Sequence, residues 1–180
     1  MRWIRMRYGK EKKEECNLDG FLSYPSAVYT VPYGVMVPKE VGNLLLPVPV
    51  SGSHIGFSTL RMEPCWMAMG QAAGIASALS IDGKVKVQNI DLSRLQDKLV
   101  DQKATLMYFK DVDYTSPHFR MVQYLGLRGY LPEWTARLQE PVDMATLTAW
   151  KKLSGKDLPG IEAGKTTRLV ALEMIYRKIK

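Results

Sequence analysis

The sequence predicts an α/β unit followed by a small, mainly α-helical domain. An apolar run from Leu44 to Val50 is typical of a buried strand, and the segment after it is long enough for one helix. Residues 84–180 then repeat apolar side chains at helical spacing. These observations divide the chain into a linker and edge-strand segment, 1–40, a strand–loop–helix unit, 41–83, and a helical domain, 84–180.

Composition and charge exclude several classes of protein. The chain has 180 residues, and its longest apolar run is far shorter than the roughly 20 residues of a membrane-spanning helix. Two cysteines and two histidines predict neither a disulfide framework nor a metal site. The net charge of +7 lies largely at the two chain ends, which favours a solvated surface over a nucleic-acid interface. Residues 1–16 lack the apolar core of a secretory signal peptide.

The first two segments are predicted to contain the strands. Residues 24–37 have strand-like composition but are interrupted by prolines, which predicts short edge strands. Leu44–Val50 is predicted as a buried strand, followed by a polar loop over Ser51–Thr59. A long helix is expected to begin near Glu63 and Pro64, because proline suits the first helical turn, and to end with Gly83 as its cap.

Two glycines inside this predicted helix need an explanation. Gly70 and Gly74 lie four residues apart on one face, and each costs about 1 kcal/mol relative to alanine. A close approach by another backbone or by a flat ligand would explain both residues. Tight packing of the helix on a sheet would explain them equally well, and the sequence leaves these alternatives open.

The last segment is predicted to form four helices. They are expected over about 90–99, 119–127, 142–153 and 167–179. Candidate N-caps are Asp91 or Ser93, Asp143, and Thr166 or Thr167. Gly129 and Gly155 are expected to end the second and third helices.

Several familiar motifs do not fit. The segment Gly160–Thr166 resembles a phosphate-binding loop, but three residues separate its glycines where four are needed. No two of the 14 glycines have the G-x-G spacing of a dinucleotide-binding turn. Cys65 stands beside the helix start, where a reactive thiol is conceivable, but its apolar neighbours favour a buried structural cysteine.

One arrangement can bind a ligand. The Ser51–Thr59 loop and the start of the following helix direct backbone N–H groups toward one region, and Arg61 adds a positive charge there. Such a region favours an anion, and a flavin fits because its reduction places negative charge near the N1–C2=O edge. A helix capped by its own loop, with Arg61 on the surface, is the alternative.

The same residues resemble a known family. Residues 24–80 are similar to the carboxyl-terminal part of the flavin domain in bacterial FAD-dependent oxidoreductases, some of which carry the label xanthan lyase. The shared pattern includes "NLL" at Asn43, "S-x-x-H" ending at His54, "S-x-R-x-x-P" ending at Pro64, and "MA-x-G-x-AAG-x-A" from Met67. The family continues its strand as "AGR", whereas proline, valine and proline stand at 47–49 here.

The resemblance implies a set of flavin contacts. We call these six the flavin-side residues: Ser51, Gly52, Ser53, His54, Arg61 and Met62. By resemblance they lie near the isoalloxazine and ribityl parts of FAD, and His54 is the candidate to face an unidentified small-molecule substrate. The implied activity is hydride transfer to FAD, with no catalytic residue assigned beyond that candidate.

The resemblance also implies that a domain is missing. The family's amino-terminal unit, which holds the ADP half of FAD, has no counterpart here, so we expect a carboxyl-terminal fragment of a longer enzyme. Alone, the chain is expected to bind FAD weakly or not at all and to be inactive. Its natural start is expected upstream, so the compartment stays unknown.

The tail has a weaker resemblance. Phe109–Val112, Arg128-Gly129 and Pro141-Val142 are similar to conserved positions of S-layer-homology-like helical repeats. This implies an alternative function, in which residues 84–180 form a non-catalytic docking module for a partner.

Overall fold

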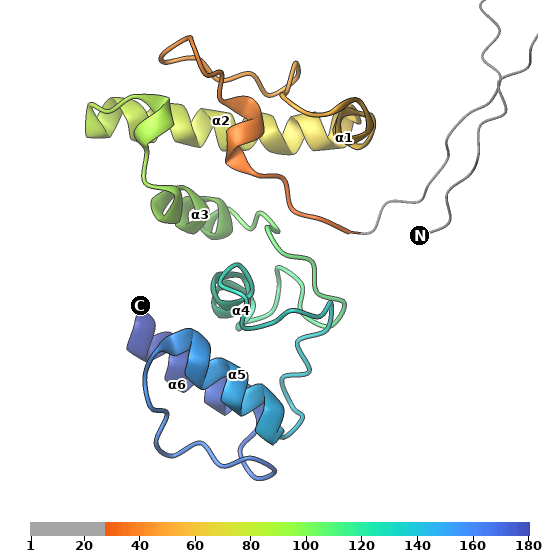
Figure 1. Cartoon of the computed structure of the whole chain (residues 1–180), viewed down its shortest axis with the longest axis vertical. Helices are drawn as coiled ribbons and strands as arrows, with labels where there is room; N and C mark the ends of the chain where they lie inside the picture. Colours follow the sequence, from red (N-terminus) through yellow and green to blue (C-terminus); the bar gives the residue numbers. More distant parts are fainter. Residues whose placement is uncertain (1–27) are drawn as a thin grey trace, which may run out of the picture.

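The structure is a computed structural model that describes residues 28–180. The predictions for residues 1–27, which include the charged start and the beginning of the strand-like segment, lie outside this range. The described elements are η1 Tyr33–Met36, α1 His54–Leu60, α2 Glu63–Gly83, η2 Val87–Asn89, α3 Leu92–Asp101, α4 Phe119–Gly126, α5 Met144–Ser154 and α6 Arg168–Ile179 (Figure 1). Over residues 28–180 the chain is therefore mainly helical and forms no β-strand, only an isolated bridge between Pro141 and Thr167.

The predicted strand over Leu44–Val50 is wrong for this structure, in which the segment is irregular. Two prolines within it, at 47 and 49, have no N–H to donate to a neighbouring strand. The segment instead follows η1: the Leu46 N–H donates to the Met36 carbonyl at 2.8 Å, and the Ser51 N–H donates to the Val35 carbonyl at 2.8 Å. The edge strands expected before residue 40 are likewise replaced, within the described part, by η1.

The predicted loop over Ser51–Thr59 is also corrected, because most of it forms the short helix α1. Ser53 is its N-cap, and its hydroxyl oxygen accepts a hydrogen bond from the Gly56 N–H at 3.0 Å. This is the usual way in which a serine satisfies an amide of the first helical turn. The helix turns the chain toward α2 and leaves only Arg61 and Met62 between the two helices.

Helix α2 begins at Glu63 with Pro64 in its first turn, as predicted. It ends at Gly83, but the left-handed residue that caps it is Lys84, with φ of 50°. One face of α2 is buried. Its buried residues are Met69, Ala73, Ala76, Leu79 and Ser80.

Two groups of buried side chains surround α2. Near its start, Met69 and Ala73 pack with Met36, Val50 and Leu60. Toward its end, Ala76 and Leu79 pack with Ile90, which follows η2, and with Leu95 and Leu99 of α3. Figure 1 shows α2 as the long helix, with η1 crossing it and α3 beside it. Because α3 completes the core beside α2, the two helices form one packing unit.

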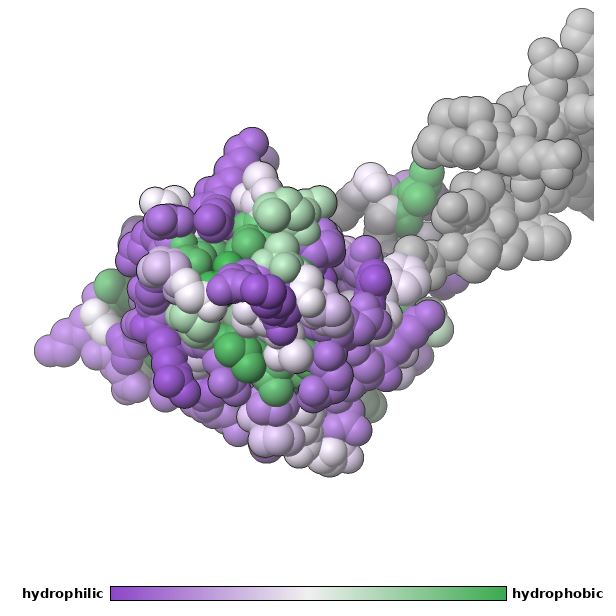
Figure 2. All heavy atoms as spheres, turned by 90° about the horizontal axis from the view of Figure 1, so that it is seen from below, coloured by the Kyte–Doolittle hydropathy of each residue, from purple (hydrophilic) through white to green (hydrophobic). Residues whose placement is uncertain are grey.

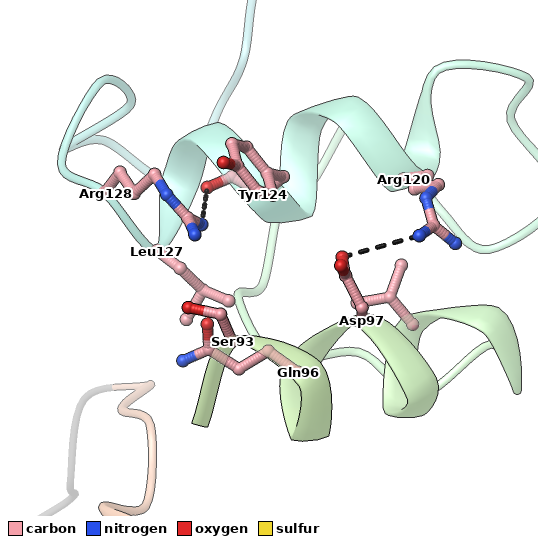
Figure 3. A pocket seen from close by; sticks show the side chains of 8 residues that line it. Ser93, Gln96, Asp97, Arg120, Tyr124, Leu127 and Arg128 are labelled. Carbon is pink, nitrogen blue, oxygen red and sulfur yellow. Dashed lines mark hydrogen bonds and ion pairs between the residues drawn. The ribbon is translucent and has the colours of Figure 1, made fainter. Parts of the chain in front are cut away.

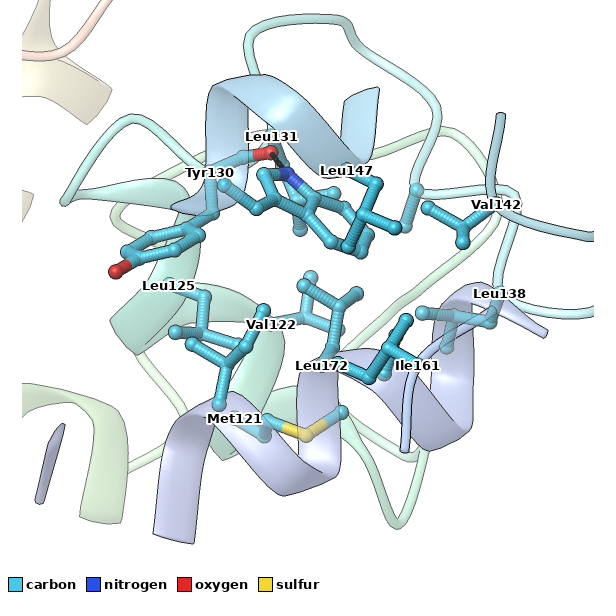
Figure 4. Packing of buried hydrophobic residues seen from close by; sticks show 14 of the residues in the cluster. Met121, Val122, Leu125, Tyr130, Leu131, Leu138, Val142, Leu147, Ile161 and Leu172 are labelled. Atoms are coloured by element: carbon cyan, nitrogen blue, oxygen red, sulfur yellow. Dashed lines mark hydrogen bonds between the residues drawn. The ribbon is translucent and has the colours of Figure 1, made fainter. Parts of the chain in front are cut away.

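The remaining helices have a core of their own, and all four predicted helices are present as α3 to α6. Asp91, Asp143 and Thr167 are the N-caps of α3, α5 and α6, as three of the candidates predicted. Figure 4 shows the buried residues of this core between α4, α5 and α6. At its centre, Trp150 is 1% exposed and its indole N–H donates to the Tyr130 carbonyl at 2.7 Å.

Candidate functional site

The structure places the flavin-side residues around α1. Ser51 and Gly52 lead into the helix, His54 is its first residue, and Arg61 is its C-cap. Met62 then serves as the N-cap of α2. All six residues are exposed, so they form part of an open surface.

Two of the contacts that shape this surface involve Gly52. A Cβ built on Gly52 would lie 3.4 Å from the Phe57 backbone nitrogen and 3.9 Å from Cδ1 of Leu60, so the chain folds back along α1 at this point. His54 and Arg61 are seven residues apart, which puts them on the same side of the helix, roughly 10 Å apart along its axis. The structure thus brings both groups to one side of α1 without direct contact between them.

The start of α2 supplies electrostatic polarity. Met62 gives the helix no side-chain cap, so the positive end of a 21-residue helix is left without a capping oxygen. Arg61 adds a full positive charge beside it, as the sequence predicts. Two residues weaken the effect: Pro64 has no N–H, and the Glu63 carboxylate already lies in the first turn. The region therefore attracts an anionic edge less strongly than a helix start without an acidic residue.

One buried polar atom near this helix start has no partner. Trp66 is half-buried, and its indole Nε1–H makes no hydrogen bond within the described part of the chain. Buried donors are almost always paired, so an acceptor from a ligand or another chain segment would satisfy this one. Sequence reasoning missed Trp66, because only its burial shows that the donor lacks an acceptor.

Cys65 lies next to Trp66 in the first turn of α2. Its side chain is half-buried and packs against the apolar group that includes Met36, Leu60 and Met69. This environment supports the structural interpretation of the cysteine over that of a reactive thiol.

Two hollows in the described surface lie away from the flavin-side residues. One of about 410 Å³ lies at the end of α2 and includes Ser80, Lys84 and Lys86. The other, of only about 10 Å³, lies between α3 and α4 (Figure 3). There the Arg128 guanidinium lies 3.4 Å from the centre of the Tyr124 ring and donates to the Tyr124 carbonyl at 3.0 Å.

The helical domain exposes several large apolar side chains. Among them are Met144 and Leu153, on opposite sides of α5, and Val170 of α6. Figure 2, which looks onto the lower end of the molecule in Figure 1, shows a small hydrophobic area ringed by hydrophilic residues.

Within residues 28–180, no group of three His, Cys, Asp or Glu side chains is arranged to hold a metal ion. None of the helices in this range has the length and apolar character needed to cross a bilayer.

Comparison with known families matches residues 9–99 to the family described as FAD dependent oxidoreductase. The match covers just over half of the chain and contains every flavin-side residue. The chain belongs to this family. Its flavin-dependent oxidoreductase region thus runs through α1 and α2 and ends within α3, and FAD is the cofactor that the family uses. No curated protein and no solved structure matches the chain.

The site residues fit one side of a flavin site. The positive helix end and Arg61 are donors suited to the polar edge of an isoalloxazine ring, and both lie on an open surface. The indole Nε1 of Trp66 is buried, so it is not part of that surface. The exposed residues could supply one wall of such a site.

Proposed function

We propose that this chain supplies the isoalloxazine and ribityl side of the FAD site in an oxidoreductase. The family match over residues 9–99 carries the proposal, because it covers both the loop before α1 and the start of α2. The flavin-side residues would contact the isoalloxazine and ribityl parts of the cofactor. The substrate of the enzyme would be a small molecule. We also propose that the chain is a carboxyl-terminal fragment of a longer bacterial enzyme. Some of the proteins that it resembles carry the label xanthan lyase.

Each residue has a proposed role that follows from its chemistry. Bound FAD supplies the hydride acceptor of the reaction. Gly52 presents bare backbone to the cofactor at the turn, where an added Cβ would be in ordinary van der Waals contact with α1. Arg61 and the start of α2 stabilise negative charge at the flavin edge. His54, exposed at the start of α1, is the candidate to orient or exchange a proton with the substrate.

The ADP half of FAD is proposed to bind outside this chain. The full sequence contains no G-x-G-x-x-G motif, whose glycines let the backbone approach a pyrophosphate. A separate amino-terminal FAD domain would supply that motif.

Flavin binding by the purified full chain tests the proposal. We expect FAD to be lost on desalting, and a fluorescence titration with FAD to show weak binding. Arg61→Ala should weaken that binding at least about tenfold, the equivalent of 1.4 kcal/mol. Arg94→Ala is the matched control, because Arg94 is an exposed arginine of α3 away from the flavin-side residues.

Two outcomes have distinct meanings. Equal FAD affinity in both arginine variants would contradict the assigned surface. Flavin absorbance that survives desalting would mean that another copy or a partner supplies the ADP-binding half. We also expect denaturation to release any bound FAD, since His54 is the only flavin-side residue with a side chain suited to covalent flavin linkage.

A docking function of the helical domain is the second candidate. The exposed apolar residues Met144 of α5 and Val170 of α6 favour it, and the S-layer-like pattern suggests a cell-envelope partner. Met144→Lys with Val170→Lys should abolish partner capture under this proposal and leave FAD titration unchanged. Arg61→Ala should have the opposite pattern.

A further inference from the structure

The short helix α1 sets how the flavin-side residues lie relative to one another. Ser53 is its N-cap, His54 is its first residue and Arg61 is its C-cap. The backbone N–H of Arg61 donates to the Phe57 carbonyl at 3.0 Å, a bond that exists only while the last turn of α1 is formed. The relative positions of His54 and Arg61 therefore depend on α1 being helical.

The sequence and burial of α1 make it a weak helix on its own. It has seven residues, far fewer than the roughly 12 to 15 that an isolated helix needs in water. Its sequence, HIGFSTL, contains a glycine, a serine, an aromatic residue and two β-branched residues, and only its leucine is a strong helix former. This leucine, Leu60, is also the only residue of α1 that is buried. Packing thus holds the helix at its carboxyl end alone.

Hydrogen bonds from outside the helix hold both of its ends. At the carboxyl end, the Tyr29 phenol donates to the Thr59 carbonyl at 3.1 Å. At the amino end, the Ser53 Oγ accepts from the Gly56 N–H at 3.0 Å. A Cβ built on Gly56 would lie only 3.2 Å from this oxygen, so the serine is in close contact with the first turn. Ser53 therefore supports the end of α1 that packing does not.

The Ser53 hydroxyl can affect a bound flavin in two ways. Its hydrogen could be donated directly to the cofactor. Alternatively, its oxygen caps α1, and the cofactor is affected through the positions of His54 and Arg61. In the structure the oxygen accepts a hydrogen bond of ordinary length from the amide that an N-cap serine normally satisfies, which favours the second way.

We propose that Ser53 is a positioning residue of the FAD site, which acts by capping α1 and not by donating its hydroxyl hydrogen to the cofactor. This inference rests on the proposed function, because it requires FAD to bind beside α1. When only the helical form of α1 binds FAD, the apparent affinity falls in proportion to the population of that form. FAD affinity should then follow the capping strength of residue 53.

Two substitutions that both remove the hydroxyl separate the two roles. Alanine is a poor N-cap, whereas glycine caps nearly as well as serine. In the FAD titration of the full chain, Ser53→Ala should raise the dissociation constant about three- to fivefold. Ser53→Gly should change it by less than about twofold, and Ser53→Asn, which supplies a strong cap, should restore the wild-type value. A direct hydroxyl contact would instead make the alanine and glycine variants equally weak.

The helical population of α1 gives a second measurement, which needs no cofactor. Nuclear magnetic resonance shifts of the Cα atoms over residues 54–60 report this population in the FAD-free chain. Ser53→Ala should lower it, while Ser53→Gly and Ser53→Asn should largely keep it. Ser93→Ala is the matched control, because Ser93 is an exposed serine of α3 and the cap of that helix is Asp91. This control should change neither the shifts nor the FAD affinity.

The contrary results separate this inference from the proposed function. Equal FAD affinities of Ser53→Ala and Ser53→Gly would overturn the positioning role, and so would a helical population that Ser53→Ala leaves unchanged. Either result leaves the proposed function standing as long as Arg61→Ala weakens FAD binding and Arg94→Ala does not. Equal affinities of these two arginine variants, or a wild-type chain that binds no FAD, would remove the site on which both proposals rest.

Discussion

At the scale of single residues, Gln123 joins two parts of the fold. Its side chain is fully buried in α4, and its Oε1 accepts hydrogen bonds from the Leu106 and Met107 N–H groups, both at 2.8 Å. Its Nε2 donates to the Met107 carbonyl at 2.7 Å. One amide thereby satisfies three backbone groups of the segment that leads from α3 to α4.

Gln123→Leu should lower the free energy of unfolding by about 3 kcal/mol, because buried donors lose their acceptor. Urea denaturation followed by circular dichroism measures the change. Gln139→Leu alters an exposed glutamine and should change stability by less than about 0.5 kcal/mol. Similar losses in the two variants would show that the three hydrogen bonds do not matter.

Asp143 gives the stability a defined dependence on pH. The backbone N–H and then the hydroxyl of Thr146 lower the pKa of the Asp143 carboxyl below its ordinary 3.8. Because the folded pKa is lower, the cap stabilises the protein above the ordinary pKa, and this contribution is lost as the pH falls through the lowered value. The pKa values of Asp113 and Asp157 shift in the same direction.

Asp143→Asn should therefore reduce, without removing, the loss of stability between about pH 5 and pH 2.5. Asparagine keeps an N-cap oxygen but carries no charge to titrate. Urea midpoints measured at both pH values give the comparison. An unchanged pH dependence in the variant would contradict the role of this carboxylate.

At the scale of elements, ion pairs connect α3 to α4 and to the carboxyl-terminal residue. Arg120 of α4 pairs with Asp101 and lies 3.4 Å from Asp97, both on α3. The Lys180 ammonium lies 3.5 Å from the same Asp97. Figure 3 shows Arg120 and Asp97 facing each other across the two helices. All of these side chains are partly exposed, so salt will screen the pairs.

Arg120→Met should cost less than about 1 kcal/mol, as expected of exposed ion pairs. Its clearer effect should be a smaller response of stability to salt between about 20 mM and 1 M NaCl. Thermal unfolding at both concentrations measures this response. A variant as salt-sensitive as the wild-type chain would exclude Arg120 from the coupling.

Local sequence predicted the helices well, because their determinants lie within a few residues. Asp91, Asp143 and Thr167 were each identifiable as caps that precede an apolar repeat. The apolar run Leu44–Val50 predicts a strand that the structure does not form, because its prolines at 47 and 49 have no N–H to donate to a neighbouring strand. Ser53 fits two interpretations. The sequence predicts it as part of a ligand-binding loop, and a serine before a short helix also predicts an N-cap.

The candidate site was predictable only in part, for a related reason. Adjacent residues such as Gly52 and His54 are placed together by the chain itself, and the family pattern located them. Trp66 is a candidate because its indole N–H is buried without a partner, and Glu63 weakens the positive end of α2. Both properties depend on the folded surroundings.

At the scale of the whole molecule, the packing indicates a domain boundary that differs from the one predicted after residue 83. Leu95 and Leu99 of α3 are buried beside α2, so α3 shares a core with the family region. The core of α4 to α6 begins after the turn that follows α3. We propose a boundary near residue 102.

Two fragments distinguish the boundaries. Residues 102–180 should be monomeric and unfold cooperatively. Residues 84–180 retain α3 without α2 and should associate or bind a hydrophobic dye, because Leu95 and Leu99 become exposed. Size-exclusion chromatography and dye fluorescence measure both properties. Equal behaviour of the fragments would contradict the boundary near 102.

The indole of Trp150, sealed in the core of α4 to α6, makes the protein its own optical probe. Trp66 lies against the other core, beside Met69, and Trp134 is 44% exposed. A Trp66→Phe variant and a Trp150→Phe variant should therefore emit with different responses to denaturant, one for each core. Tryptophan fluorescence can thus report whether the core beside α2 or the core of α4 to α6 unfolds first.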